Sequence, residues 1–245
     1  MKNGKSKTVN GLLLVDKPAG ISSFGVVARV RGIIKNETGQ KIKIGHTGTL
    51  DPAATGLMIL VLGKYTKRAG EFSKLDKTYE AELTLGQTST TGDKEGEITK
   101  VGDRGEGIGD SRPSKKALQD VLSTFVGQIT QTPPAYSAIK IDGQRAYKLA
   151  RQGKTPVIKP REITIYSLEL TDYSYPKVKL TVSVSSGTYI RTLAEDIGTK
   201  LGTGAYLSAL RRTEVGNYSL DRAIDIDKSS VSDIINYETQ TAPAK

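Results

Sequence analysis

Asp51 is the residue of this chain whose surroundings point most directly to chemistry. It stands between a leucine and a proline in KIGHTGTLDPAATGLMILVLGK, residues 43–64, where a polar loop runs into an apolar segment. Pro52 restricts the backbone of Asp51 to extended conformations, which holds the carboxylate at the edge of the loop. Residues that allow a close backbone approach or supply hydroxyl groups surround it: Gly45, Thr47, Gly48, Thr49 and Thr55. A rigidly held carboxylate of this kind is suited to nucleophilic or base chemistry.

The same dipeptide also has a structural explanation. Asp followed by Pro is typical of a helix N-cap and first helical position, and Gly56 could close a single turn. Taken alone, the dipeptide favours this explanation, whereas its neighbours favour chemistry.

The elements that must position this loop follow from apolar patterning, which predicts a mixed chain without a βαβ rhythm. A helix is predicted behind Ser22 and Ser23 as caps, because Val26, Val27, Val30, Ile33 and Ile34 share one face. Two further helices are predicted over residues 115–125 and 189–201, and strands over 11–15, 57–62, 78–85 and from 177 onward. The alternation in TYEAELTL and KVKLTVSVSS favours antiparallel sheet.

Composition restricts the classes of function. The 245 residues include 36 Lys and Arg against 26 Asp and Glu, and this surplus of positive charge suggests a polyanionic partner. Cysteine is absent and His46 is the single histidine, so the sequence predicts no metal site and no cysteine nucleophile. No apolar run approaches the length of a membrane span or a signal peptide, and we expect a cytoplasmic protein that does not bind membranes.

Six segments together resemble the TruB family of bacterial tRNA pseudouridine-55 synthases. In chain order they are GLLLVDKPAGISS, GHTGTLDPAATGLMILVLGKYTK, KTYEAELTLG, PPAYSAIKIDGQRAYKLARQG, SSGTYIRTLAEDIG and LRRTEVGNYSL. The resemblance covers residues 11–220. It implies the α+β pseudouridine synthase fold, with a mixed, mainly antiparallel central sheet flanked by helices and loops, and a thumb insertion.

The resemblance also implies a domain organisation. A flexible basic N-terminus (1–10) precedes the catalytic domain (11–220), which contains a Gly-rich surface loop at about 101–114 and a thumb at about 131–159. Residues 221–245 form a short C-terminal segment and tail, too short for the full PUA-like domain that follows in longer relatives.

The reaction that the resemblance implies is the isomerisation of uridine 55 in the tRNA T loop to pseudouridine, without a cofactor. Asp51 matches the catalytic aspartate; whether it bonds to the sugar, attacks the base or abstracts a sugar proton stays open. Tyr79 matches the tyrosine that stacks on the target base and is a candidate for proton removal from C5. Arg191 matches the arginine that pairs with the catalytic carboxylate. Without the resemblance, Tyr79 would be ordinary sheet packing and Arg191 a solvated residue near a helix N-terminus.

Further positions match the family's substrate-binding residues. Tyr189 and Leu210 align with pocket residues, and His46 with the histidine that enters the T loop near the space left by the flipped uridine. Lys17 matches a position near the active site, although a surface lysine would explain it nearly as well. The thumb adds basic residues suited to phosphate contacts, namely Lys140, Arg145, Lys148 and Arg151.

The expected partner is therefore the T-arm stem-loop of tRNA, bound by a monomer that needs no guide RNA and no obligate protein partner. One alternative is a non-catalytic RNA-binding or tRNA-folding protein that uses the same basic surface. Another is the guide-RNA-dependent archaeal and eukaryotic relative, which the bacterial type of thumb and the short C-terminus disfavour.

Overall fold

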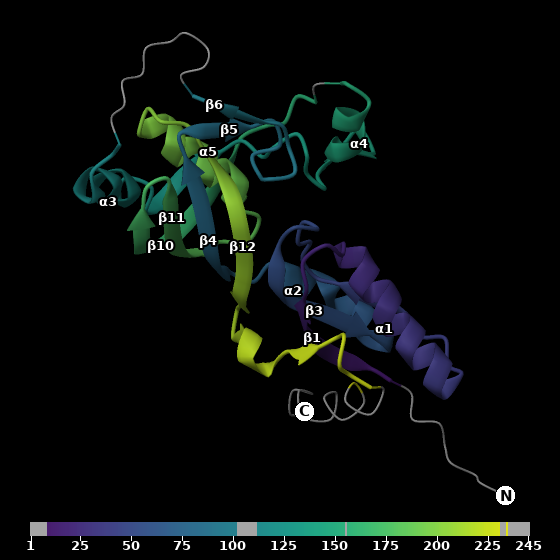
Figure 1. Ribbon diagram of the computed structural model, residues 1–245. Helices are drawn as coiled ribbons and strands as arrows, with labels where there is room; N and C mark the ends of the chain where they lie inside the picture. Colours follow the sequence, from purple (N-terminus) through teal and green to yellow (C-terminus); the bar gives the residue numbers. More distant parts are fainter. Residues whose placement is uncertain (1–8, 102–111, 155, 231–233, 235–245) are drawn as a thin grey trace, which may run out of the picture. The chain divides into compact units, whose positions relative to one another are not determined.

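The structure is a computed structural model that describes residues 9–101, 112–154, 156–230 and 234, and it divides into two compact units (Figure 1). Unit 1 comprises residues 1–75 and 212–245, and unit 2 comprises residues 76–211. Parts of four predicted segments fall outside the described residues: 1–8 of the N-terminus, 102–111 of the Gly-rich loop, 155 of the thumb, and 231–233 and 235–245 of the tail.

Unit 1 is built on a small sheet in which β1 (Gly11–Lys17) runs antiparallel to β3 (Thr55–Leu62). The short strand β2 (Ile44–His46) is also antiparallel to β3, and β14 (Ile224–Asp225) is parallel to β1. The remaining elements of the unit are η1 (Gly63–Arg68), α2 (Ala69–Ser73), β13 (Tyr218–Ser219) and η2 (Leu220–Arg222).

The central strands of unit 1 are buried along almost their whole length, which explains why their sequences are continuously apolar. Alternate side chains of β1 and β3 form a core cluster with Phe72 and Val215. Helix α1 (Ser23–Thr38) buries Val26, Val27 and Val30 as its apolar spacing predicts. Ser22 is the N-cap and accepts a hydrogen bond from the backbone N–H of Gly25 at 3.0 Å, whereas Ser23 is not a cap.

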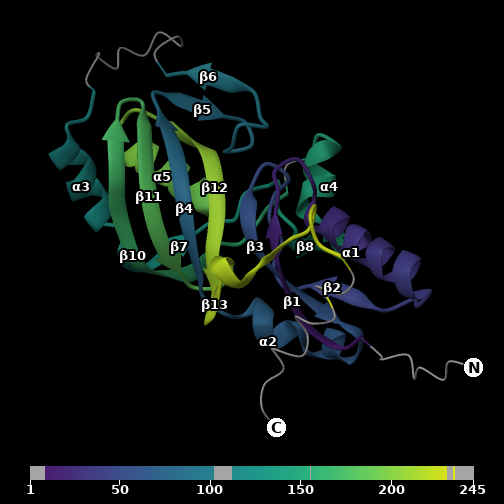
Figure 2. The same cartoon turned by 60° about the horizontal axis from the view of Figure 1, so that its bottom comes forward.

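Unit 2 contains a larger sheet in the order β12-β4-β11-β10-β7, and Figure 2 shows β12, β4, β11 and β10 side by side. The bounds are β4 (Lys77–Leu85), β7 (Gly127–Gln131), β10 (Arg161–Ser174), β11 (Lys177–Val184) and β12 (Ala205–Val215), whose last residues belong to unit 1. The β4–β11, β11–β10 and β10–β7 pairs are antiparallel. The predicted α+β class with mainly antiparallel strands is therefore confirmed.

Helices α3 (Lys115–Ser123) and α5 (Ile190–Lys200) contact each other, and they pack on β10 and β4 respectively. Two small hairpins extend from unit 2, β5 (Gln87–Ser89) with β6 (Ile98–Lys100) and β8 (Lys140–Ile141) with β9 (Gln144–Arg145). Helix α4 (Ala146–Arg151) follows the second hairpin. None of the helices among the described residues has the length and apolarity that a membrane crossing requires.

Candidate active site

Asp51 lies in the loop of unit 1 that joins β2 to β3, and it is half-buried. The backbone N–H of Ala54 donates to the carbonyl oxygen of Asp51 at 3.1 Å, which closes a tight turn over Pro52. The sequence leaves a helix start closed by Gly56 and a chemical role as alternatives. The structure shows a turn closed by Ala54 instead, because no helix begins at Asp51 and Gly56 belongs to β3.

The residue before Asp51 is fixed from α1 by a single hydroxyl. Ser23 Oγ accepts from the backbone N–H of Leu50 and donates to its carbonyl oxygen, both at 2.8 Å. Ser23 is buried, so water does not compete for these hydrogen bonds. A residue predicted as a helix cap therefore holds the candidate catalytic loop.

The residues after Asp51 are held by Lys17, at the end of β1. Its side chain has no exposed surface, and its ammonium donates to the carbonyl oxygens of Pro18 at 2.9 Å, Pro52 at 3.1 Å and Ala54 at 2.6 Å. The N–H of Gly20 donates to Pro52 as well, at 2.9 Å. A buried ammonium must be satisfied by such acceptors, so Lys17 acts as a support of the loop. A contact of Lys17 with substrate stays a prediction.

Arg212, to which no sequence motif assigns a role, holds the loop at Gly48 and the start of β3 at Leu57. Its guanidinium is buried and donates to the carbonyl oxygens of Leu57 at 2.7 Å and Gly48 at 3.2 Å. Gly56 has φ +102, and a Cβ at this position would collide with the backbone of Arg212. Glycine is therefore required there by both conformation and space. His46 is half-buried on β2, opposite Leu60 of β3.

In unit 2, Tyr79 lies on β4 opposite Val182 of β11 and is 7% exposed. Arg191 is in the first turn of α5, where a positive charge is unfavourable without a partner. The structure supplies partners: the Arg191 guanidinium donates to the carbonyl oxygens of Thr91 at 3.1 Å and Tyr136 at 2.8 Å. These bonds orient the buried guanidinium.

Asp93 is a further partner of Arg191 that sequence analysis missed. Its carboxylate lies 3.6 Å from Nε of Arg191. The same carboxylate accepts from Thr91 Oγ1 at 2.6 Å and from the N–H of Glu95 at 3.0 Å. The segment TTGDKEG reads as an ordinary polar turn, and only the distant Arg191 gives its aspartate significance.

Tyr189 precedes α5, and its backbone is fixed by a buried glutamine. Gln131 Oε1 accepts from the Tyr189 N–H at 2.8 Å, and Gln131 Nε2 donates to the Tyr189 carbonyl at 3.0 Å. The Arg161 guanidinium lies 5.1 Å from the centre of the Tyr189 ring, within the range of a cation–π contact. Leu210, on β12, is half-buried.

Two carboxyl groups on α5 have perturbed proton affinities. Burial, and next the charge of Asp196, raises the pKa of Glu195, although Arg191 opposes the shift. Burial raises the pKa of Asp196 too. Perturbed carboxyl groups are frequent at functional sites, but these follow from packing on α5.

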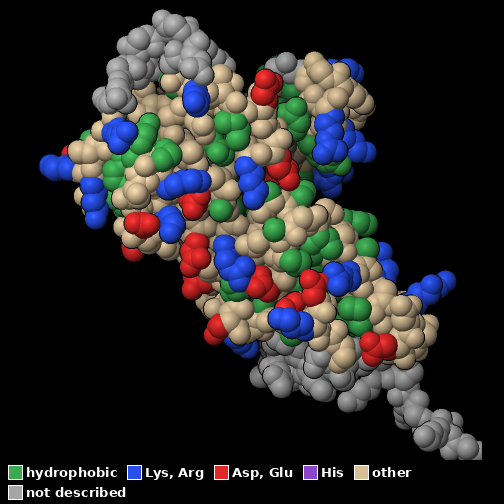
Figure 3. All heavy atoms as spheres, viewed as in Figure 1, with side chains coloured by type: hydrophobic (Ala, Val, Ile, Leu, Met, Phe, Trp, Pro, Cys, Tyr) green, Lys and Arg blue, Asp and Glu red, His purple; other side chains and the backbone are tan. Residues whose placement is uncertain are grey.

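The basic residues predicted for RNA contacts lie on the β8–β9 hairpin and α4. Lys140, Arg145, Lys148 and Arg151 are all exposed, and Figure 3 shows Lys and Arg side chains gathered over α4. Arg145 donates to the carbonyl of Ala138 at 2.7 Å, and the Arg151 guanidinium lies 5.6 Å from the centre of the Tyr147 ring. The other charged groups of this set are available to solvent and to phosphate.

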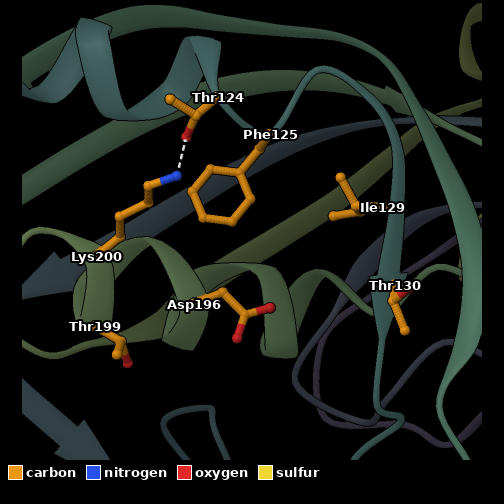
Figure 4. Close-up of a pocket in the computed structure, with 7 residues that line it drawn as sticks. All are labelled: Thr124, Phe125, Ile129, Thr130, Asp196, Thr199 and Lys200. Carbon is orange, nitrogen blue, oxygen red and sulfur yellow. Dashed lines mark hydrogen bonds between the residues drawn. The ribbon is translucent and has the colours of Figure 1, made fainter.

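A separate pocket of about 500 Å³ lies between α5 and the segment from the end of α3 into β7 (Figure 4). Lys200 crosses it, donating to Thr124 Oγ1 at 2.7 Å and lying 5.3 Å from the centre of the Phe125 ring. None of its seven lining residues is a predicted site residue. In the described part of the chain, no group of three His, Asp or Glu side chains could hold a metal ion.

The predicted site residues thus divide between the units. Unit 1 carries Lys17, His46 and Asp51, and unit 2 carries Tyr79, Tyr189, Arg191 and Leu210. Within each unit, side chains from distant parts of the chain fix the backbone at the candidate catalytic groups.

Comparison with known proteins gives concordant matches. Residues 35–190 match the profile of the TruB family pseudouridylate synthase N-terminal domain, and residues 191–242 match that of the tRNA pseudouridylate synthase B C-terminal domain. The chain is 44% identical over 228 residues to tRNA pseudouridine synthase B of Bordetella pertussis, which covers 93% of this chain and 89% of that protein. It is 41% identical over 237 residues to the protein of the same name from Burkholderia mallei, covering 97% of this chain and 74% of that one.

Solved structures share the fold. A chain in the crystal structure of a Cbf5–Nop10–Gar1 complex is 29% identical with a TM-score of 0.66, over 89% of this chain and 54% of that one. A chain in an H/ACA RNP bound to a substrate RNA containing 2′-deoxyuridine is 26% identical with a TM-score of 0.63, over 89% and 51%. This chain therefore spans about half the length of each.

Proposed function

Because this chain belongs to the TruB family of pseudouridine synthases, we propose that it isomerises uridine 55 in the T loop of tRNA to pseudouridine, with Asp51 as the catalytic aspartate. The observation that carries the proposal is the construction of the Asp51 loop. Lys17, Ser23 and Arg212 come from three different elements, and each bonds to the backbone of this loop. Such support keeps a catalytic group in a productive geometry.

The reaction is an isomerisation, so the residues need not supply or remove atoms overall. The N1–C1′ bond breaks, the base turns, and C1′ bonds to C5, which gives up its proton while N1 gains one. In the proposal the Asp51 carboxylate starts the bond cleavage, and Tyr79 stacks on the base and receives the C5 proton. Arg191 pairs with the carboxylate of Asp51, while its contacts with Asp93 and two carbonyls keep it oriented.

Substrate binding is assigned to both units. Tyr189 and Leu210 line the uridine pocket, and His46 enters the space that the flipped uridine leaves, which offsets part of the few kcal/mol that flipping costs. The exposed basic residues of the thumb neutralise phosphates of the T arm. We propose that the protein acts without guide RNA or a partner protein.

The test is tritium release from C5-labelled uridine in a T-arm hairpin, with purified protein and no guide RNA. We expect the wild type to turn over the hairpin. Asp51→Asn should react at less than about 1% of the wild-type rate, because the amide keeps the shape of the side chain but not its charge. Asp221→Asn is the matched control, since it makes the same change at an exposed aspartate of unit 1. Hairpin binding without turnover by the wild type would instead identify a non-catalytic RNA-binding protein.

A further inference from the structure

Phe24 presents an aromatic ring to solvent at the start of α1. It is 67% exposed, and it is the one strongly exposed large apolar side chain among the described residues of unit 1. Single exposed apolar side chains are common on protein surfaces, so the exposure alone does not indicate a function. The residues near Phe24 in the structure do indicate one.

Phe24 is tied closely to the candidate catalytic loop. The neighbouring residue Ser23 bonds through its hydroxyl to both backbone groups of Leu50, the residue before Asp51. Adding covalent distances along this path places the α-carbons of Phe24 and Asp51 within about 14 Å of each other. Stacked bases are spaced about 3.4 Å apart, so this distance corresponds to about four nucleotides.

The chain around Phe24 is basic. Residues 23–43 contain five basic residues and one acidic residue, Glu37, and one of the five, Arg29, is paired with Asp227 at 2.6 Å. Lys35 lies on the same face of α1 as Phe24, eleven residues or about 16 Å further along the helix axis, and is exposed. Lys41 and Lys43 are exposed in the segment that follows the helix. These exposed lysines can contact the phosphates of a nucleic acid.

We propose that Phe24 stacks on a base of the RNA substrate within about four nucleotides of the uridine presented to Asp51, while Lys35, Lys41 and Lys43 contact phosphates further along the RNA. The proposal rests on the proposed function for the position of the uridine. An exposed aromatic ring that stacks on a base, combined with basic residues that follow the nucleic-acid backbone, is a usual means by which proteins bind unpaired nucleotides without reading their sequence. The exposed lysines favour a nucleic acid over a protein as the partner, because binding to an apolar protein surface would not require positive charges.

A tryptophan at this position gives a direct test. The chain contains no tryptophan, so the emission of Phe24→Trp comes from one side chain. Titration with a T-arm hairpin at one fixed salt concentration should quench this emission as the base stacks. Tyr166→Trp is the matched control, since Tyr166 is 51% exposed on β10 of unit 2, and its emission should not change.

Affinity supplies the second measurement. Phe24→Leu keeps an apolar side chain but removes the aromatic face, and its Kd for the hairpin should rise about tenfold, or 1.4 kcal/mol. Phe24→Tyr keeps the ring and should bind within about twofold of the wild type. Comparing the Kd values of Phe24→Leu and Phe24→Tyr thus shows whether binding requires an aromatic ring or only an apolar side chain.

Unchanged emission of Phe24→Trp at saturating hairpin, with wild-type Kd for Phe24→Leu, would overturn the proposal. Emission that depends on protein concentration without RNA would overturn it too, because a second copy of the chain would then cover the ring. Tritium release separates this inference from the proposed function. A protein that binds the hairpin with quenching but releases no tritium loses the proposed reaction and keeps the stacking contact.

Discussion

Replacement of Lys17 by methionine tests whether the catalytic loop is held from within unit 1. Methionine preserves most of the volume and removes the ammonium, which donates to three carbonyls. Of these acceptors, the Pro52 carbonyl still accepts a hydrogen bond from the N–H of Gly20, and the Pro18 carbonyl is in a partly buried position that water can reach. The Ala54 carbonyl, bonded at 2.6 Å in a buried position, loses its strongest contact.

The magnitude follows from these partners. A buried carbonyl left without its donor costs about 1–3 kcal/mol. The variant also loses the hydrogen bonds to Pro18 and Pro52, but it no longer has to bury a charged ammonium, and this gain offsets part of that loss. We therefore expect Lys17→Met to be less stable by about 1–3 kcal/mol, a fall in Tm of about 2–12 °C for a chain of this size. The turn that follows Asp51 is also released. Because a displacement of about 1 Å can cost a hundredfold in rate, we expect the single-turnover rate to fall about a hundredfold.

Thermal unfolding and single-turnover tritium release at saturating hairpin measure the two effects, and the Kd for the hairpin should stay within about threefold. Lys64→Met is the control, since Lys64 is exposed in the same unit. A Tm and a rate equal to those of the wild type would refute the supporting role. A tenfold higher Kd with an unchanged rate at saturation would show instead that Lys17 contacts RNA.

Three further predictions concern buried and half-buried charges. Arg212→Lys keeps the charge, but an ammonium cannot hold the carbonyls of Gly48 in the loop and Leu57 in β3 in the same fork. The single-turnover rate should therefore fall about tenfold, and wild-type activity would contradict the positioning role. Burial first, and then the charge of Asp196, raises the pKa of Glu195. Ionised Glu195 therefore destabilises the fold as the pH rises above 4.5, the ordinary pKa of a glutamate, so Glu195→Gln should raise Tm at pH 7 and not at pH 4. The pKa shift of Glu82 has the opposite direction, because hydrogen bonds from Lys177 and another side chain lower the pKa of Glu82. The stabilisation by ionised Glu82 is lost as the pH falls below 4.5, so Glu82→Gln should lower Tm at pH 7. Equal Tm changes for the two glutamate variants would contradict this reasoning.

The sequence predicted those elements whose burial follows a simple period. Helix α1 and the strands β4 and β11 each place their apolar residues on a regular face, and this pattern survives in the structure. The long strand β10 was not predicted. Its pairing with β11 is shifted between Ile165 and Ser167 and again between Leu170 and Asp172, and such bulges interrupt the alternation that marks a strand.

The candidate site was predictable only in part, for a physical reason. Asp51 stands out because its loop is unusual within a few residues of sequence. The roles of Ser23 and Gln131 depend instead on hydrogen bonds to residues 27 and 58 positions away, respectively. A serine at a helix start and a glutamine at the end of a strand have ordinary local explanations, and no local pattern indicates which backbone group each will bind.

The way the Asp51 loop is held makes the chemical and the structural roles separable. The loop backbone is bonded by Lys17, Ser23 and Arg212, and these bonds involve carbonyl and amide groups of the loop, which Asp51→Asn leaves in place. Asp51→Asn should therefore keep the Tm and lose the reaction, whereas Lys17→Met should lower both. If Asp51→Asn lowered the Tm as much as Lys17→Met, the carboxylate itself would be holding the loop, and its loss of activity could no longer be assigned to chemistry.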